Sequence, residues 1–215
     1  MRFLNLPGAP VLLERVGGHT DPAADLRTVC VQAVVESLAD DIGRVIIVAA
    51  GDHTAGWSAD LDYPLRRLVG GRSTAGQALP LSLAVGRQLI GDRLAGRELI
   101  MRTVSSTAVT ETVHPADDDA LIVAMADGSA LGRTGGPDVV HPRAATYDHS
   151  VVEAWQSGEP TELAALDTDL GSAVMATGAP VWSHLAQLAG GRSYRSKINY
   201  ADSPFGTFYL VARWS

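Results

Sequence analysis

Apolar and polar residues follow two kinds of pattern along the chain, and together these patterns predict helices alternating with strands. The clearest helix covers residues 21–40, with Asp21 at the N-cap and Pro22 at the first helical position. Its apolar residues recur at helical spacing, namely Leu26, Val29, Cys30, Ala33, Val34 and Leu38. Residues 79–94 show a second helical pattern, which two internal glycines weaken.

Three apolar runs predict strands, at residues 44–50, 98–105 and 120–126. The first run has no alternation of polar residues, which indicates a strand that is covered on both faces. Each run is separated from the next by more chain than a hairpin needs, and helices occur in at least two of the gaps. We therefore expect a layered α/β fold, with a central, largely parallel or mixed sheet flanked by helices.

After about residue 143 the pattern changes to three or four short helices, around residues 147–157, 161–166, 169–177 and 180–190. Residues 193–215 then have the pattern of two strands joined by a turn at 201–206. We expect this C-terminal β-hairpin to return to the sheet, so that residues 1–215 form one domain.

Composition limits the partners of the chain. Its net charge is −7 and no cluster of Lys and Arg opposes it, so nucleic acid is excluded as a partner. The single cysteine, Cys30, excludes an internal disulfide and fits a reducing compartment. No apolar run approaches the roughly 20 residues that cross a bilayer. Two prolines and a glycine interrupt the apolar start, which argues against a signal peptide. We expect a cytoplasmic protein without membrane contact.

Polar residues follow the predicted strands, at the edge where parallel α/β sheets bind ligands. They form the segments Gly51-Asp52-His53, Ser105-Ser106-Thr107 and Asp127-Gly128-Ser129. Phosphate-loop, nucleophile-elbow and zinc-protease motifs are absent from the sequence. Of the six histidines, only His53 follows a buried strand with an acid beside it. It is a candidate metal ligand, and a purely structural role remains open.

Four stretches carry a resemblance to a known family: the strand that ends in GDH, then ALIVAMADGSA, HPRAATYD and the closing YRSKINYADSPFGTFYLVARW. Together they resemble the superfamily of class III extradiol ring-cleavage dioxygenases, and in particular its small actinobacterial branch. The resemblance covers nearly the whole chain in order. It implies a fold that holds non-haem Fe(II) with two histidines and a carboxylate, leaving open positions for catechol and O₂.

The resemblance also shows which of these groups the chain lacks. Gly8 stands where the first metal histidine is expected, whereas His53 matches the second. Ala130 stands where the family has its acid–base histidine. The family has its glutamate ligand near the C-terminus, and Asp202 is the only acid in the tail that carries the resemblance. Glycine offers no side-chain donor and alanine moves no proton, a step worth roughly 10²–10⁴ in rate. Ring cleavage by the family mechanism is therefore not expected.

Three interpretations remain at the level of sequence. In the first, the protein is a catalytically degenerate member that binds a small molecule or a protein partner in the inherited pocket. In the second, it is a metal-dependent oxidoreductase whose site for Fe(II) or another divalent metal is rebuilt around His53. The candidate further ligands are Asp52, His19, His141 and Asp202. In the third, Asp52 and His53 only close the strand.

The expected lining of a binding site consists of residues at two strand ends, namely Gly51, Asp52, His53, Asp127, Ser129 and Arg133. Arg133 suits an anionic group because guanidinium binds carboxylate in a forked geometry. The resemblance also makes a homodimer reasonable.

Overall fold

The protein is built on one seven-stranded sheet, seen in a computed structural model that describes residues 1–13, 20–61, 78–105, 119–132 and 140–215. The strands are β1 (Arg2–Leu6), β2 (Arg44–Ala50), β3 (Ala55–Trp57), β4 (Glu98–Val104), β5 (Ala120–Met125), β6 (Ser196–Asp202) and β7 (Tyr209–Trp214). The helices are α1 (Ala24–Ser37), α2 (Leu81–Ile90), α3 (Ala144–Ser157), α4 (Pro160–Ala164), α5 (Thr168–Ala173) and α6 (Ala179–Ala189), with short 3-10 turns at Pro10–Leu12 and Gly91–Leu94.

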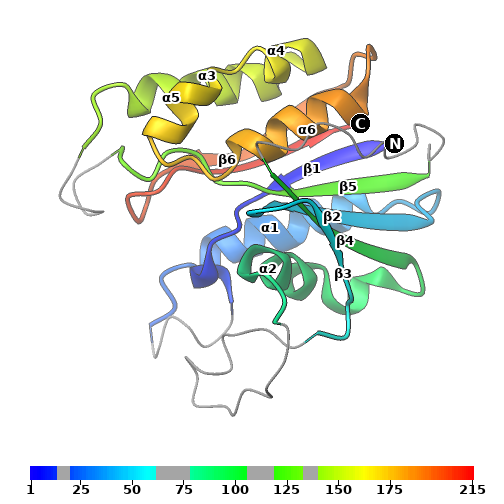
Figure 1. The fold of residues 1–215 in the computed structure, drawn as a ribbon. Coiled ribbons are helices and arrows are strands. Elements are labelled where there is room, and N and C mark those ends of the chain that lie inside the picture. The colour runs from blue at the N-terminus through cyan, green and yellow to red at the C-terminus, as the bar shows by residue number, and fades with distance from the viewer. Residues whose placement is uncertain (14–19, 62–77, 106–118, 133–139) are drawn as a thin grey trace.

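The strand order is β3-β4-β2-β5-β1-β7-β6. The four central strands β4, β2, β5 and β1 are parallel, whereas β3, β7 and the β6–β7 hairpin add antiparallel pairs at the two sides. This arrangement confirms the expected layered α/β fold with a mixed sheet and a C-terminal hairpin that returns to it. The two chain ends meet where β1 pairs with β7 (Figure 1).

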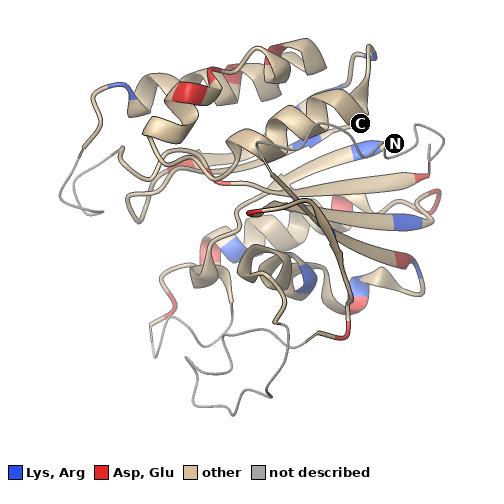
Figure 2. Ribbon diagram, in the orientation of Figure 1, with Lys and Arg blue, Asp and Glu red and all other residues tan. Residues whose placement is uncertain are grey.

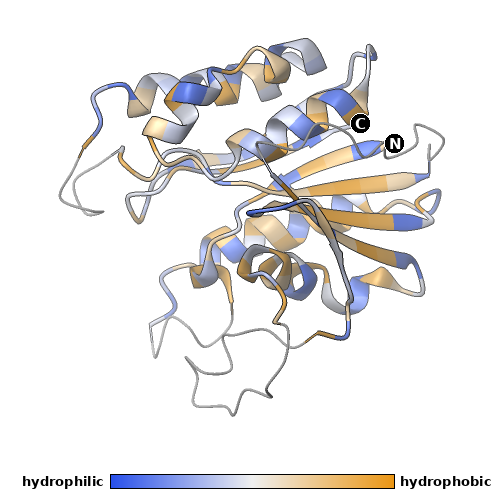
Figure 3. Cartoon of the chain, viewed as in Figure 1, coloured by the Kyte–Doolittle hydropathy of each residue, from blue (hydrophilic) through white to orange (hydrophobic). Residues whose placement is uncertain are grey.

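Helices cover both faces of the sheet. Helices α1 and α2 lie on one face, and α3 to α6 lie on the other (Figure 1). Strands β2 and β5 are therefore buried from both sides, and their interiors carry no charged residue (Figure 2) and are strongly apolar (Figure 3). This double cover explains why both strands are continuous apolar runs in the sequence.

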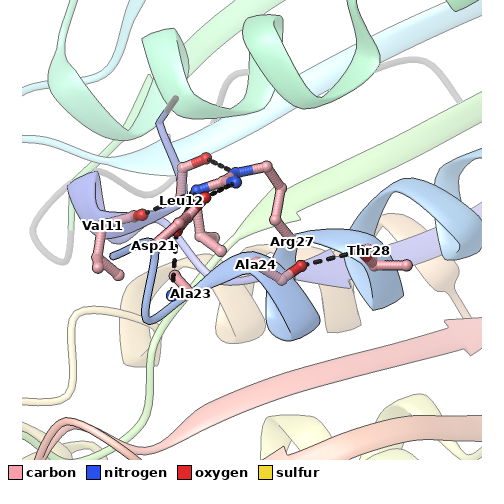
Figure 4. A network of polar contacts seen from close by, with 7 residues as sticks. All are labelled: Val11, Leu12, Asp21, Ala23, Ala24, Arg27 and Thr28. Carbon is pink, nitrogen blue, oxygen red and sulfur yellow. Dashed lines mark hydrogen bonds and ion pairs between the residues drawn. The ribbon is translucent and has the colours of Figure 1, made fainter. Parts of the chain in front are cut away.

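Helix α1 begins two residues later than the sequence predicts. The Asp21 side chain accepts a hydrogen bond from the backbone N–H of Ala23 (3.2 Å), so it closes a turn that precedes the helix. Arg27 also forms an ion pair with Asp21 and donates from Nε to the carbonyl of Leu12 (2.7 Å), as Figure 4 shows. Arg27 thus ties the start of α1 to the segment that follows β1.

Strands β1 and β3 were not among the runs that predicted strands. Strand β1 has five residues, of which three are apolar, with a proline directly after it, and β3 has only three residues in a polar, glycine-rich passage. Both are placed by pairing with longer neighbours, β1 with β5 and β3 with β4. Local sequence carries little of that information.

Asn5 is a fully buried polar residue in β1 that joins three elements. Its Nδ2 donates to the carbonyl of Leu210 on β7 (2.8 Å) and to that of Ala126 at the end of β5 (3.3 Å). Its Oδ1 accepts a hydrogen bond from Nε1 of Trp182 on α6 (2.7 Å). One side chain therefore sets the position of two strands and of the helix above them.

We predict that Asn5→Ala lowers the free energy of unfolding by about 2–4 kcal/mol, because it leaves the buried Trp182 N–H and the Leu210 carbonyl without their partner. Urea unfolding followed by tryptophan fluorescence measures this loss. Asn199→Ala is the matched control, since Oδ1 of Asn199 is buried without a hydrogen bond among the described residues. An equal loss in both variants would contradict the role assigned to Asn5.

Candidate functional site

The carboxyl ends of three adjacent parallel strands bring the candidate site residues to one edge of the sheet. The ladders pair Leu6 with Met125 and Ala49 with Met125, so β1, β5 and β2 end side by side. The chain segments that hold Gly8, Asp127 and Asp52 leave the sheet at these ends. This is the edge at which parallel α/β sheets hold their ligands.

Asp127 lies at the centre of this edge and is held by residues that are distant in the sequence. Its Oδ1 accepts the backbone N–H of Gly8 (3.1 Å), and its carboxyl also accepts a hydrogen bond from the Thr177 side chain. Its backbone carbonyl accepts the N–H of Gly178 (2.9 Å), directly before α6. The carboxyl group is thus fixed between the end of β1 and the start of α6.

The surroundings of Asp127 favour its protonated form. Burial raises the pKa of its carboxyl to about 7, although the hydrogen bonds from Gly8 and Thr177 act in the opposite direction. Two further titratable groups, Cys30 on α1 and Tyr209 on β7, are close enough to feel its charge. Burial, aided by the Asp127 charge, raises the pKa of each of them to about 12. Both are neutral at pH 7, so Asp127 is the group of these three that exchanges a proton near neutrality.

The space beside Gly8 is occupied by Ser82, the second residue of α2. A Cβ atom on residue 8 would lie 2.8 Å from Ser82 Oγ and 3.0 Å from Ser82 Cβ, and 3.5 Å from Asp127 Oδ2. Contacts this short require a neighbour to move. Any side chain at position 8, histidine included, would therefore have to displace α2 or the Ser82 side chain.

The segment after β2 lies at the carboxyl edge of the sheet, as expected, but its polar side chains are exposed to solvent. Asp52 and His53 are both exposed. The His53 carbonyl accepts a hydrogen bond from Thr103 Oγ1 (2.9 Å), and Gly51 packs directly against Thr103 and donates its N–H to the Val104 carbonyl (2.9 Å). The contacts that hold this segment are thus made by its backbone.

Ser129 takes part in a buried polar pair and not in the exposed edge. It is fully buried, and its Oγ and backbone N–H donate to the two carboxyl oxygens of Asp148 on α3 (2.5 and 2.8 Å). Burial raises the pKa of Asp148, against these two hydrogen bonds. Ala130 donates its N–H to the carbonyl of Val174 (3.0 Å). The pair anchors the loop that carries Asp127.

The other candidate residues are dispersed. Asp202 ends β6, and four strand spacings, about 19 Å of sheet, separate β6 from the β2 strand that precedes His53. His141 accepts the Arg143 backbone N–H at its Nδ1 (3.2 Å) in the turn before α3. Arg133 and His19 lie outside the described residues.

These positions do not fit the iron site that the resemblance implies. A metal ion needs donors within about 2.0–2.6 Å of a common point, which the spacing of Asp202 from His53 excludes. Among the residues that the structure describes, no group of three His, Cys, Asp or Glu side chains could hold a metal ion.

No described helix is long and apolar enough to span a bilayer.

Three residues that hold the candidate residues in place were not predicted from the sequence: Ser82, Thr177 and Asp148. Each contacts Gly8, Asp127 or Ser129 from a helix or a turn far away in the chain. A weak signal was present for two of them, since Ser82 and Thr177 lie close to the prolines that start α2 and α6. Only the fold shows which side chains they meet.

Comparison with known proteins bears on the fold. No protein-family model matches the chain, and no curated protein matches it in sequence. Among solved structures, the chain is similar to the crystal structure of the uncharacterized protein JW3007 from Escherichia coli K12, with a TM-score of 0.53 and 14% identity over 100% of this chain and 99% of that one. The two chains therefore share a fold over their whole length.

We predict that the protein becomes less stable as pH rises, because Asp127 loses its proton in the folded state. The pKa of Asp127 is about 7 in the folded protein, against the usual 3.8. The protonated carboxyl therefore stabilises the fold fully below pH 3.8, and this stabilisation is lost as pH rises through 7. Between pH 5 and pH 8 this loss is on the order of 2 kcal/mol in the free energy of urea unfolding. Asp127→Asn removes the titrating group and should abolish this part of the slope. An unchanged slope would contradict the assignment.

A second prediction concerns the close contact at Gly8. Gly8→Ala should lower the free energy of unfolding by about 1–2 kcal/mol, because the added methyl group overpacks against Ser82. Gly191→Ala is the control, since beyond its own chain neighbours no atom of the described residues lies within 4 Å of the place where its Cβ would be. Thermal or urea unfolding of both variants makes the comparison. Equal stability of the two variants would show that Ser82 moves freely out of this space.

Proposed function

We propose that the protein is a member of the class III extradiol dioxygenase superfamily that does not cleave aromatic rings. Instead, it binds a small molecule at the carboxyl edge of its sheet, where a hydroxyl group of that molecule faces Asp127. The observation that carries this proposal is the contact between Gly8 and Ser82. The position of the expected first metal histidine lacks a donor, and the Ser82 side chain of α2 occupies the place where its Cβ would be.

The remaining groups support the same conclusion. His53, which matches the second metal histidine, is exposed, and Asp202 lies four strands away from its strand. Ala130 cannot replace a histidine as a proton carrier. The chemistry of iron-dependent ring opening therefore has no matching set of groups among the described residues.

Asp127 supports the binding half of the proposal. Its carboxyl is fixed by Gly8 and Thr177 at the usual ligand-binding edge of an α/β sheet. With a pKa of about 7, it accepts a hydrogen bond from a hydroxyl group when ionised and donates one when protonated. A neutral, hydroxyl-bearing molecule satisfies both states, whereas an anion facing Asp127 would be repelled by the ionised state.

Catechol is the probe that tests both halves of the proposal. We expect it to shift the Gly8 amide resonance in a ¹H–¹⁵N spectrum in a saturable way, and we expect Asp127→Ala to weaken this binding about tenfold. In the presence of Fe(II) and O₂, no ring-cleavage product should appear by absorbance or mass spectrometry. Asn199→Ala serves as the control for binding, since Asn199 lies on the remote strand β6.

Metal content distinguishes this proposal from a metal site rebuilt around His53. Untagged protein purified without oxygen, and its His53→Ala variant, should both contain far less than one metal ion per chain. Stoichiometric iron, manganese or zinc that is lost in His53→Ala, together with product from catechol, would overturn the proposal. It would instead establish a rebuilt metal site around His53. Absence of any catechol-induced shift would overturn the binding half alone.

A further inference from the structure

Two basic side chains lie on the side of the sheet that α6 covers. Arg102 is on β4, two residues before its carboxyl end, and His184 lies in the middle of α6. Both side chains are half-buried. Helix α6 packs across β4 and β2, and Arg102 is close enough to His184 for its charge to act on the imidazole.

Arg102 lacks a counter-charge within the described part of the chain, where it forms no hydrogen bond or ion pair. Other half-buried arginines of the protein are satisfied. Arg97 donates to the carbonyls of Ile42 (2.8 Å), Leu94 and Ala39, and Arg87 donates to those of Ala59 and Leu61. Arg102 is thus a guanidinium whose five N–H donors are available.

The space next to Arg102 is open on the side of the neighbouring strand. The ladder between β3 and β4 pairs Arg102 with Gly56, and paired residues present their side chains on the same face. Gly56 has no side chain, and apart from Gly56 and its two chain neighbours no described atom lies within 4 Å of the position that its Cβ would occupy. A small group can therefore approach Arg102 from this side without displacing a side chain of the described residues.

The electrostatics of the pair are unfavourable without an anion. Burial lowers the pKa of His184, and the positive charge of Arg102 lowers it further. The acids on the neighbouring helices, Glu162 on α4 and Asp169 on α5, are exposed and have no part in this shift. An oxyanion between the two side chains would reverse the effect of Arg102, since it attracts the protonated imidazole as well as the guanidinium.

We propose that Arg102 and His184 form a binding site for an oxyanion, of the carboxylate, sulfate or phosphate type. The guanidinium of Arg102 supplies the permanent charge and the forked pair of donors. His184 supplies a further donor and takes up a proton as the anion binds. This site does not depend on the function proposed for Asp127.

Sulfate is the probe for this site, because its charge does not change between pH 6 and pH 8. The ring Cε1–H resonance of His184, assigned by its loss in His184→Gln, is followed while sulfate replaces chloride at constant ionic strength. We expect a saturable shift and tighter binding at pH 6 than at pH 8. The exposed His149 on α3 provides the internal reference. Benzoate, titrated in the same way, shows whether a planar carboxylate binds better than a tetrahedral anion.

The variants decide the outcome. Arg102→Gln should weaken binding at least tenfold, and Arg102→Lys should bind with intermediate affinity because it keeps the charge but loses the fork. Arg2→Gln is the control, because Arg2 lies at the amino end of β1 and forms an ion pair with Asp41. It should leave the affinity unchanged. Circular dichroism confirms that each variant is folded. The proposal is overturned if neither anion causes a saturable shift, or if Arg102→Gln and Arg102→Lys both bind as the wild type does.

Discussion

The hydrogen bonds of Asn5 are the constraint on which the candidate site depends. An amide in the middle of a sheet is tolerated only when its donors and acceptor are all satisfied, because a buried polar group without a partner costs about 1–3 kcal/mol. Asn5 meets this requirement by bonding to Ala126, Leu210 and Trp182. These three residues belong to the end of β5, to β7 and to α6, so these elements cannot shift independently. Asp127 follows Ala126 directly, and its position is therefore set by a side chain buried in the core.

The same architecture explains why Asp127 has an unusual acidity. Two hydrogen bonds donated to a carboxylate normally lower its pKa, because both donors favour the charged form. At Asp127 the loss of water outweighs them, and the pKa rises to about 7. The apolar side chains of the core and the neutral neighbours Cys30 and Tyr209 offer no compensating positive charge. Asp148 also has a raised pKa, but Asp127 has its raised pKa at the ligand-binding edge of the sheet, where perturbed carboxyl groups commonly mark functional sites.

The fold was easier to predict from the sequence than the site, and the reason is physical. Strands β2 and β5 and helix α1 have patterns that their own burial imposes, so their existence could be predicted locally. The strand order, the pairing of β1 and β3 and the contact of Ser82 with Gly8 depend on chain segments that meet only in the folded state. His53 was a candidate metal ligand because of the strand and the acid that precede it. The exposure of His53 could not be predicted from the sequence, because the direction of a side chain in a loop depends on the backbone contacts of that loop. Here the contact is with Thr103.

Helix α6 connects the two groups of polar side chains found on this side of the molecule. Its start is fixed at Asp127 through Thr177 and Gly178, and His184 follows after about 7.5 Å of helix rise from Ala179. Trp182 lies between them in the chain and is the residue that Asn5 holds in place. A change that moves α6 must therefore alter the environment of Asp127 and of His184 together. A change in the chemistry of either group alone should leave the other unaffected, and this difference separates a displaced helix from a lost ligand contact.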